Sequence, residues 1–129
     1  MSESSNQQIR NWGLFCHLSA LSLWLGVPFG NVIIPLLVWL IKKDDIPLVD
    51  REGKESLNFQ ISFTLYGTAI GLVGVLAILM TLPDPSFPWL QISVLVAVVI
   101  CHISLVIYAA IKVSNDESYK YPLTIRFLK

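Results

Sequence analysis

The chain has 129 residues, 54% of them hydrophobic, and its nine basic residues balance nine acidic ones. This length suits a single domain, and the apolar content exceeds that of an ordinary soluble protein. Because the net charge is zero, no basic field is available to attract nucleic acid, and we exclude nucleic acid as a partner.

The first apolar run covers about residues 8–26 and is long enough to cross a bilayer, which needs roughly 20 residues. The polar segment before it lacks a basic region and a cleavage site, so we expect no removable signal peptide. Turn-forming residues from Gly26 to Asn31 separate it from a second run over residues 29–41. This second span contains Pro35 and reaches only about 20 Å, so it thins the bilayer, gains length from snorkelling Lys42 and Lys43, or enters without crossing.

Residues 42–55 form a mixed-charge loop that leads into a third apolar run over residues 56–82. We expect Asp50 to cap the helix that follows, because its carboxylate can accept hydrogen bonds from the free amides of a first turn. Arg51 and Glu55 are spaced to pair on the surface of this helix. A helix from Asp50 to Leu82 is longer than a bilayer requires, so its first turns should lie outside the hydrocarbon.

A connection over residues 83–88 contains three prolines and precedes the last apolar run, residues 89–111. Trp89 stands where an aromatic interface anchor is expected, and Lys112 ends the run. The tail, residues 112–129, alternates apolar Leu123, Ile125 and Phe127 with polar residues. This period is typical of a strand, but an extended tail along the membrane interface fits equally well.

The positions of the basic residues predict the topology. They precede the first apolar run, separate the second from the third, or follow the last: Arg10; Lys42, Lys43, Arg51 and Lys54; Lys112, Lys120, Arg126 and Lys129. Short loops rich in Lys and Arg stay in the cytoplasm. The pattern therefore predicts an all-α polytopic membrane protein with four transmembrane helices and cytoplasmic N- and C-termini. The lack of a transit peptide places it in a bacterial inner membrane.

Polar residues on the third span form the candidate binding site. Glu55, Asn58, Ser62 and Tyr66 recur at helical spacing, and His17 on the first span lies at a comparable depth. Polar groups inside a membrane are costly and mark sites by default, which suggests a vestibule for a headgroup, an ion or a polypeptide segment. The alternative is that His17 and Asn58 bond to each other or to backbone carbonyls and only fix helix packing.

Two further patterns concern cysteine, histidine and glycine. The dipeptides Cys16–His17 and Cys101–His102 carry metal-ligand side chains, but neighbouring helical residues point about 100° apart and no further ligand is evident. We therefore predict reduced, packing cysteines, no metal and no cofactor. Gly67, Gly71 and Gly74 give one helix face that permits close approach of another helix, from this chain or from a second copy.

Several short motifs together resemble a known family. They include Pro28-Phe-Gly30-Asn31, Pro35, Trp39, Asp50, Gly53-Lys54 and the tail sequence Tyr121-Pro-Leu-Thr-Ile-Arg-Phe127. In these the chain is similar to a widespread family of small bacterial membrane proteins. That family is distantly similar to the twenty-kilodalton subunit of the chloroplast inner-envelope protein translocon. The resemblance implies a four-span helical protein, and any translocation activity rests on analogy.

No nucleophile with a neighbouring base, phosphate loop or metal-hydrolase motif is present in the sequence. We therefore expect a non-enzymatic membrane subunit or adaptor in protein translocation or membrane-complex assembly. Its partners would be the lipid bilayer and either a partner membrane protein or a second copy. The alternative is a small oligomeric channel or transporter that uses the polar stripe.

Overall fold

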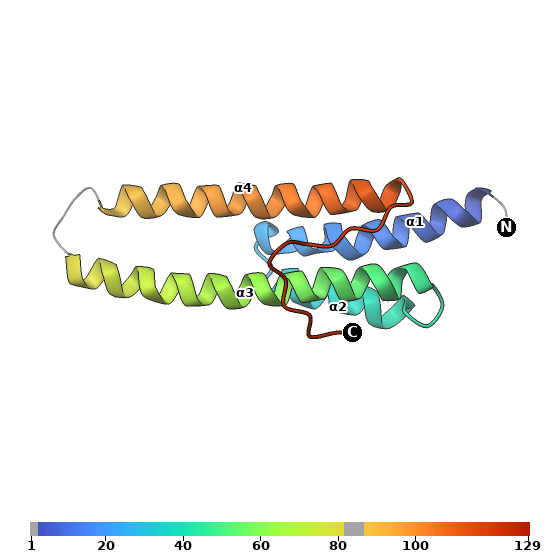
Figure 1. Ribbon diagram of the computed structural model, residues 1–129, viewed down its shortest axis with the longest axis horizontal. Coiled ribbons are helices and arrows are strands. Elements are labelled where there is room, and N and C mark those ends of the chain that lie inside the picture. Colours follow the sequence, from blue (N-terminus) through green and yellow to red (C-terminus); the bar gives the residue numbers. More distant parts are fainter. Residues whose placement is uncertain (1–2, 82–86) are drawn as a thin grey trace.

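The computed structural model describes residues 3–81 and 87–129, which contain helices and connections but no strand (Figure 1). This confirms the all-α fold class. The elements, in chain order, are α1 (Glu3–Leu18), the 3-10 helix η1 (Ser19–Leu25), α2 (Gly30–Lys42), α3 (Pro47–Thr81) and α4 (Phe87–Ser114). Most of the proline-rich connection predicted over residues 83–88 lies outside the described residues. The chain after α4, residues 115–129, contains no helix and is called the tail from here on; it turns at residues 115–116 and again at residues 122–123, where Leu123 has a φ of 54°.

The first two predicted spans form a helical hairpin, and its second helix, α2, is short and lies close to the predicted residues 29–41. The expected helix over residues 8–26 begins earlier, at Glu3, and its last turns are the 3-10 helix η1. The chain then reverses through Gly26, whose φ of 87° is strained for any side chain, and enters α2. The tip of this hairpin lies beside the middle of α3 and α4, where Asn31 bonds to Thr64 and Trp24 to His102 (Figure 1).

Beyond this tip, α3 and α4 continue together as a long apolar hairpin (Figure 1). Both are long and apolar enough to cross a membrane, and none of the most apolar stretch of α3 is buried. Large side chains such as Leu79, Met80 and Leu95 are mostly exposed. Soluble proteins do not leave apolar patches of this size in water, whereas lipid covers them without penalty. The chain is therefore a membrane protein with two long apolar helices.

Charged residues gather at the opposite end of the molecule, where the N-terminus, the α2–α3 turn and the end of α4 lie (Figure 1). Arg10 pairs with Asp116 at 3.0 Å, and Lys42 pairs with Asp45 at 3.3 Å. Lys112 pairs with Glu117 across the turn that ends α4. The N-terminus, the α2–α3 turn and the end of α4, which the sequence assigns to one side of the membrane, thus lie at one end of the fold, whereas the C-terminus lies near its middle (Figure 1).

The start of α3 differs from the prediction. The helix begins at Pro47, inside the expected loop, because proline has a preset φ and no amide hydrogen to satisfy in a first turn. The prediction that Asp50 caps the helix is wrong: its carboxylate accepts hydrogen bonds from Trp39 and Lys54. The predicted pair between Arg51 and Glu55 is also wrong, because Arg51 donates to Glu52 and Glu55 faces the tail.

Candidate functional site

Helix α3 carries polar residues on two faces. The inner stripe consists of residues four apart that face α1, α2 and α4: Glu52, Ser56, Gln60 and Thr64. The outer stripe consists of residues that contact the tail: Glu55, Asn58, Ser62 and Tyr66. Because residues at this spacing stack along one side of a helix, each stripe presents a continuous row of polar atoms.

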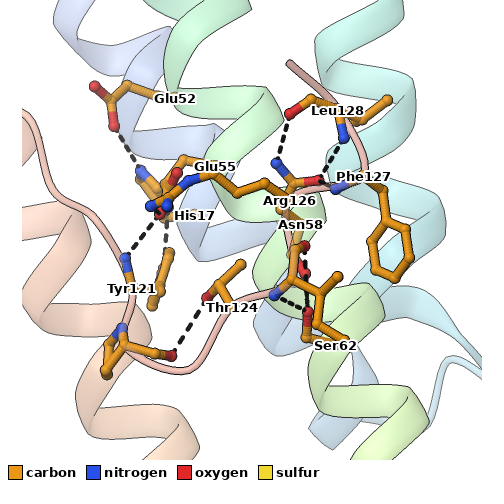
Figure 2. A network of polar contacts seen from close by, with 12 residues as sticks. His17, Glu52, Glu55, Asn58, Ser62, Tyr121, Thr124, Arg126, Phe127 and Leu128 are labelled. Atoms are coloured by element: carbon orange, nitrogen blue, oxygen red, sulfur yellow. Dashed lines mark hydrogen bonds and ion pairs between the residues drawn. The ribbon is translucent and has the colours of Figure 1, made fainter.

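The inner stripe begins with a buried acid–base pair. Glu52 is 1% exposed and His17 is fully buried, and His17 Nε2 lies 3.2 Å from Glu52 Oε2. The second oxygen of Glu52 accepts a hydrogen bond from Arg51 Nε at 2.8 Å. On the other side of the imidazole, the Tyr121 hydroxyl lies 3.0 Å from His17 Nδ1 (Figure 2). Glu52 thereby joins α3 to α1, and His17 joins both helices to the tail.

Deeper along the inner stripe, Gln60 joins α3 to both α2 and α4. Its Oε1 accepts hydrogen bonds from His102 Nε2 at 2.9 Å and from Asn31 Nδ2 at 3.3 Å. His102 Nδ1 accepts a further bond from Trp24, so the imidazole uses both nitrogens in its neutral form. Three buried polar atoms in this region have no partner in the described structure: Gln60 Nε2, Ser19 Oγ and Ser22 Oγ.

The outer stripe binds the main chain of the tail. Tyr66 donates its hydroxyl to the Leu123 carbonyl at 3.2 Å, and Ser62 Oγ accepts from the Ile125 amide at 2.9 Å. Asn58 Oδ1 accepts from the amides of Phe127 and Leu128, at 3.0 and 2.8 Å, and its Nδ2 donates to the Leu128 carbonyl at 2.9 Å (Figure 2). Every bond listed here ends on a backbone atom of the tail.

The spacing of these contacts follows from the geometry of the two segments. Tyr66, Ser62 and Asn58 are four residues apart on α3 and meet Leu123, Ile125 and Phe127, which are two apart on the tail. Four helical residues advance about 6 Å, and two extended residues advance about 6.6 Å. The tail therefore runs antiparallel to α3 in register. Residues 124–129 form no strand, so the strand prediction is wrong for them. The segment lies along α3, and the prediction that it follows the membrane interface stays a prediction.

Glu55 and Tyr121 fix the start of this segment. Glu55 Oε1 accepts from the Tyr121 amide at 2.8 Å and lies 3.6 Å from the Arg126 guanidinium (Figure 2). The Tyr121 ring stacks on Phe59 with a centroid distance of 4.0 Å. Burial raises the pKa of the Tyr121 hydroxyl above its ordinary value, so the hydroxyl stays protonated beside His17.

A half-open pocket of about 250 Å³ lies between α3, α4 and the tail residues Pro122 and Leu123. Its lining is mainly apolar and includes Phe63, Val98 and Leu105, with Leu123 from the tail at one edge. His102 contributes a wall of this pocket, but both of its nitrogens are bonded within the protein. The pocket therefore offers packing surface for an apolar group and few polar contacts.

The motif residues that carry the sequence resemblance meet mainly at the α2–α3 junction. Trp39 donates to Asp50 at 2.9 Å, Lys54 donates to the same carboxylate at 2.7 Å, and Gly53 lies against the Trp39 ring. A Cβ atom on Gly53 would approach Trp39 Cδ1 to 2.6 Å. The remaining motif residues shape the hairpin of α1, η1 and α2. Pro28 lies in its exposed turn and Gly30 lies against Ser22. Asn31, at the start of α2, bonds to Gln60 of α3, and Pro35 is buried within α2.

The predicted site residues are thus divided between two networks. Glu55, Asn58, Ser62 and Tyr66 meet on the tail. His17, on α1, contacts Glu52 of the inner stripe and Tyr121 of the tail. The hydrogen bond suggested between His17 and Asn58 is not formed, because these side chains face different partners. The tail now occupies the outer stripe, so the predicted vestibule is covered by the chain itself.

The two cysteine–histidine dipeptides have different environments. Cys16 is buried and Cys101 is exposed, and both are free thiols. Among the described residues, no three His, Cys, Asp or Glu side chains gather in a way that could hold a metal ion. On the glycine face, a Cβ atom on Gly67 or Gly71 would meet nothing within 4 Å among the described residues. At Gly74, α4 contacts this face, because Gln91 Nε2 donates to the Gly74 carbonyl at 3.0 Å.

Sequence reasoning missed Glu52 and Tyr121 as site residues, and it placed Gln60 only beside the stripe. Glu52 appeared to belong to a solvated loop because that segment is rich in charge. The signal that could have found it is the repeat of polar residues at positions 52, 56, 60 and 64, which defines a second face. Tyr121 carries no comparable signal, since its burial depends on where the tail folds back.

Comparisons with known proteins give one match. The model of the magnetosome magnetite crystal formation protein family matches residues 8–128. Searches of the curated proteins and of the solved structures find no match.

Proposed function

Because the chain belongs to the magnetosome magnetite crystal formation protein family across residues 8–128, we propose that it is a non-enzymatic membrane subunit. It would help to assemble a membrane complex in which magnetite crystals form. The family name supports the crystal-formation part of this proposal, and the structure supports the part that concerns assembly in a membrane.

The observation that carries the proposal is the division of the molecule into two parts. The apolar hairpin of α3 and α4 exposes Leu79, Met80 and Leu95, which suits lipid. The other part contains a stripe of polar residues on α3 that binds an extended polypeptide, here the tail. A protein with a lipid-facing hairpin and a polypeptide-binding helix is suited to hold other proteins at a membrane.

Within this proposal the membrane topology is the one expected from the sequence. All four apolar segments enter the bilayer, with α2 the shortest, and both termini face the cytoplasm. The membrane is the bacterial inner membrane or one derived from it. The clustering of Arg10, Lys42 and Lys112 at one end of the fold supports this orientation.

The partners we propose are the lipid bilayer and a second membrane protein or a second copy of the chain. The similarity to a translocon subunit adds a finer form of the proposal, in which the protein handles a polypeptide segment at the membrane. A non-enzymatic role is supported by His17, Glu52 and His102, whose polar atoms contact other groups of the same chain rather than facing an open cavity.

Affinity purification in a mild detergent tests the assembly role. We expect the wild-type chain to bring down specific membrane proteins, and the double variant Asn58→Ala/Ser62→Ala to change that set. Thr68→Ala is the matched control, because Thr68 bonds only to its own helix at Thr64. If the wild-type chain never retains another protein, the assembly role is lost.

Electron microscopy of a deletion strain tests the crystal-formation role in a host that makes magnetite. We expect crystals of altered size or number, restored by the wild-type chain. Crystals that are unchanged in the deletion strain would remove this part of the proposal.

A small oligomeric channel or transporter is the second candidate. The specific observation that favours it is that three polar atoms of the described residues are buried without a partner, on Gln60 of α3 and on Ser19 and Ser22 of η1. Flux of ions or small solutes into liposomes tests it. Flux above that of empty vesicles, abolished by Gln60→Leu, would support a channel, and flux equal to that of empty vesicles would eliminate it.

A further inference from the structure

The outer stripe holds the tail mainly by its main chain, and its ion pair with a tail side chain joins Glu55 to Arg126. Leu123 is 88% exposed and Phe127 is 50% exposed, although the backbone atoms of both are bonded to α3. The bonds from Asn58 and Ser62 end on amides and carbonyls that every residue except proline possesses. The stripe can therefore accept other sequences, provided that they are extended.

The stripe also requires an occupant. Asn58 and Ser62 are each 1% exposed beneath the tail, and all recorded bonds of the Asn58 side chain go to the tail. If the tail left, both polar atoms of the Asn58 side chain would lose their partners, whereas Ser62 Oγ would keep its bond to the Asn58 carbonyl at 2.7 Å. Buried or lipid-covered polar groups without partners are costly. A second extended segment would restore the same bonds in the same register.

From these observations we infer that the outer stripe is a receptor for an extended segment of a partner protein, which the chain's own tail occupies as a displaceable substitute. The inference rests on the proposed function and specifies the partner's chemistry. The segment has free amides at alternate positions, no proline at those positions, and side chains that tolerate an apolar surrounding. A basic residue beside Glu55, as Arg126 is here, adds charge complementarity.

The geometry of the tail is compatible with such an exchange. The tail leaves α4 through a turn at Asn115–Glu117, where Asp116 has a φ of 60°, and the contacts on the outer stripe begin only at Tyr121. A tethered tail has a local concentration of about millimolar, so it outcompetes a free segment unless its own bonds are weakened. The wild-type chain should therefore bind an added segment poorly, and a chain with a weakened tail should bind it well.

Binding of a synthetic peptide to the full chain tests this inference. The probe is a fluorescent peptide of residues 119–129, and the protein is reconstituted in nanodiscs of phosphatidylethanolamine and phosphatidylglycerol. In the tail-weakened variant Ile125→Pro/Phe127→Pro, which removes two amides that bond to α3, we expect binding at least about tenfold tighter than to the wild-type chain. Adding Asn58→Ala to this variant should remove most of that gain.

Two modified peptides show whether the main chain is what is recognised. N-methylation at Ile125 and Phe127 should abolish binding, whereas N-methylation at Arg126, between them, should leave it within about threefold of the unmodified peptide. Helical circular dichroism of each variant, matching that of the wild-type chain, shows that the fold is retained. Empty nanodiscs give the contribution of the lipid alone.

The inference is overturned if the folded, tail-weakened variant binds the peptide no better than empty nanodiscs do. It is equally overturned if Asn58→Ala or N-methylation at Ile125 and Phe127 leaves binding unchanged, since the peptide would then bind elsewhere. This assay uses no cellular partner, so its failure is distinguishable from a failure of co-purification, which tests the proposed function itself.

Discussion

Asn58 uses both polar atoms of its side chain to hold the last residues of the tail. Replacing it with alanine leaves the Phe127 and Leu128 amides without acceptors. We predict that Asn58→Ala destabilises the docked tail by about 1–3 kcal/mol, the usual cost of leaving buried polar groups unpaired. The measurement is protease susceptibility of the tail in mild detergent. Thr68→Ala, which alters only a bond within α3, should behave like the wild-type chain. Equal protease susceptibility of the wild-type chain, Asn58→Ala and Thr68→Ala would refute the prediction.

Gly53 and Gly71 provide a matched pair on the same helix. A methyl group on Gly53 would approach the Trp39 ring to 2.6 Å, whereas one on Gly71 would meet open space. We predict that Gly53→Ala destabilises the protein by roughly 1–3 kcal/mol through overpacking. Gly71→Ala should be neutral or stabilising by up to about 1 kcal/mol, because alanine favours helix. Thermal unfolding in detergent measures both, and a Gly53→Ala protein as stable as Gly71→Ala would contradict the packing described here.

At the scale of the elements, Glu52 is the residue that joins α3 to α1 by way of His17. We predict that Glu52→Ala destabilises the protein by about 1–3 kcal/mol, because His17 and Arg51 both lose an acceptor. Glu52→Gln keeps a side-chain oxygen of the same reach and should lose less. Denaturant unfolding in detergent micelles gives the comparison. If the two variants are equally stable, the hydrogen bond to His17 contributes nothing.

The helices themselves were predictable from apolar run length, because a bilayer sets how many residues a span needs. The start of α3 was not, since proline and mixed charge over residues 42–55 read equally well as a loop and as a first helical turn. On α3, the spacing of Glu55, Asn58, Ser62 and Tyr66 grouped residues that all contact the tail in the structure. Their partner could not be predicted, because docking of the tail depends on contacts between residues more than fifty positions apart.

For the whole molecule, the distribution of Lys and Arg predicts which segments share one side of the membrane. We predict that single cysteines introduced at Lys43 and Lys129, in a chain with Cys16→Ser and Cys101→Ser, react with an impermeant maleimide only after the cells are opened. Asp84→Cys, in the connection expected on the outer side, should react in intact cells. Labelling of Lys43→Cys from outside intact cells would reverse the proposed topology.

The central claim is that the tail lies along α3 and is held by its main chain at alternate residues. Hydrogen exchange of the tail amides in lipid nanodiscs, resolved to single residues by mass spectrometry, tests it most directly. We predict slow exchange at Ile125, Phe127 and Leu128, faster exchange at Arg126, and loss of protection at Phe127 and Leu128 in Asn58→Ala. Uniformly rapid exchange along the tail of the wild-type chain would contradict the claim.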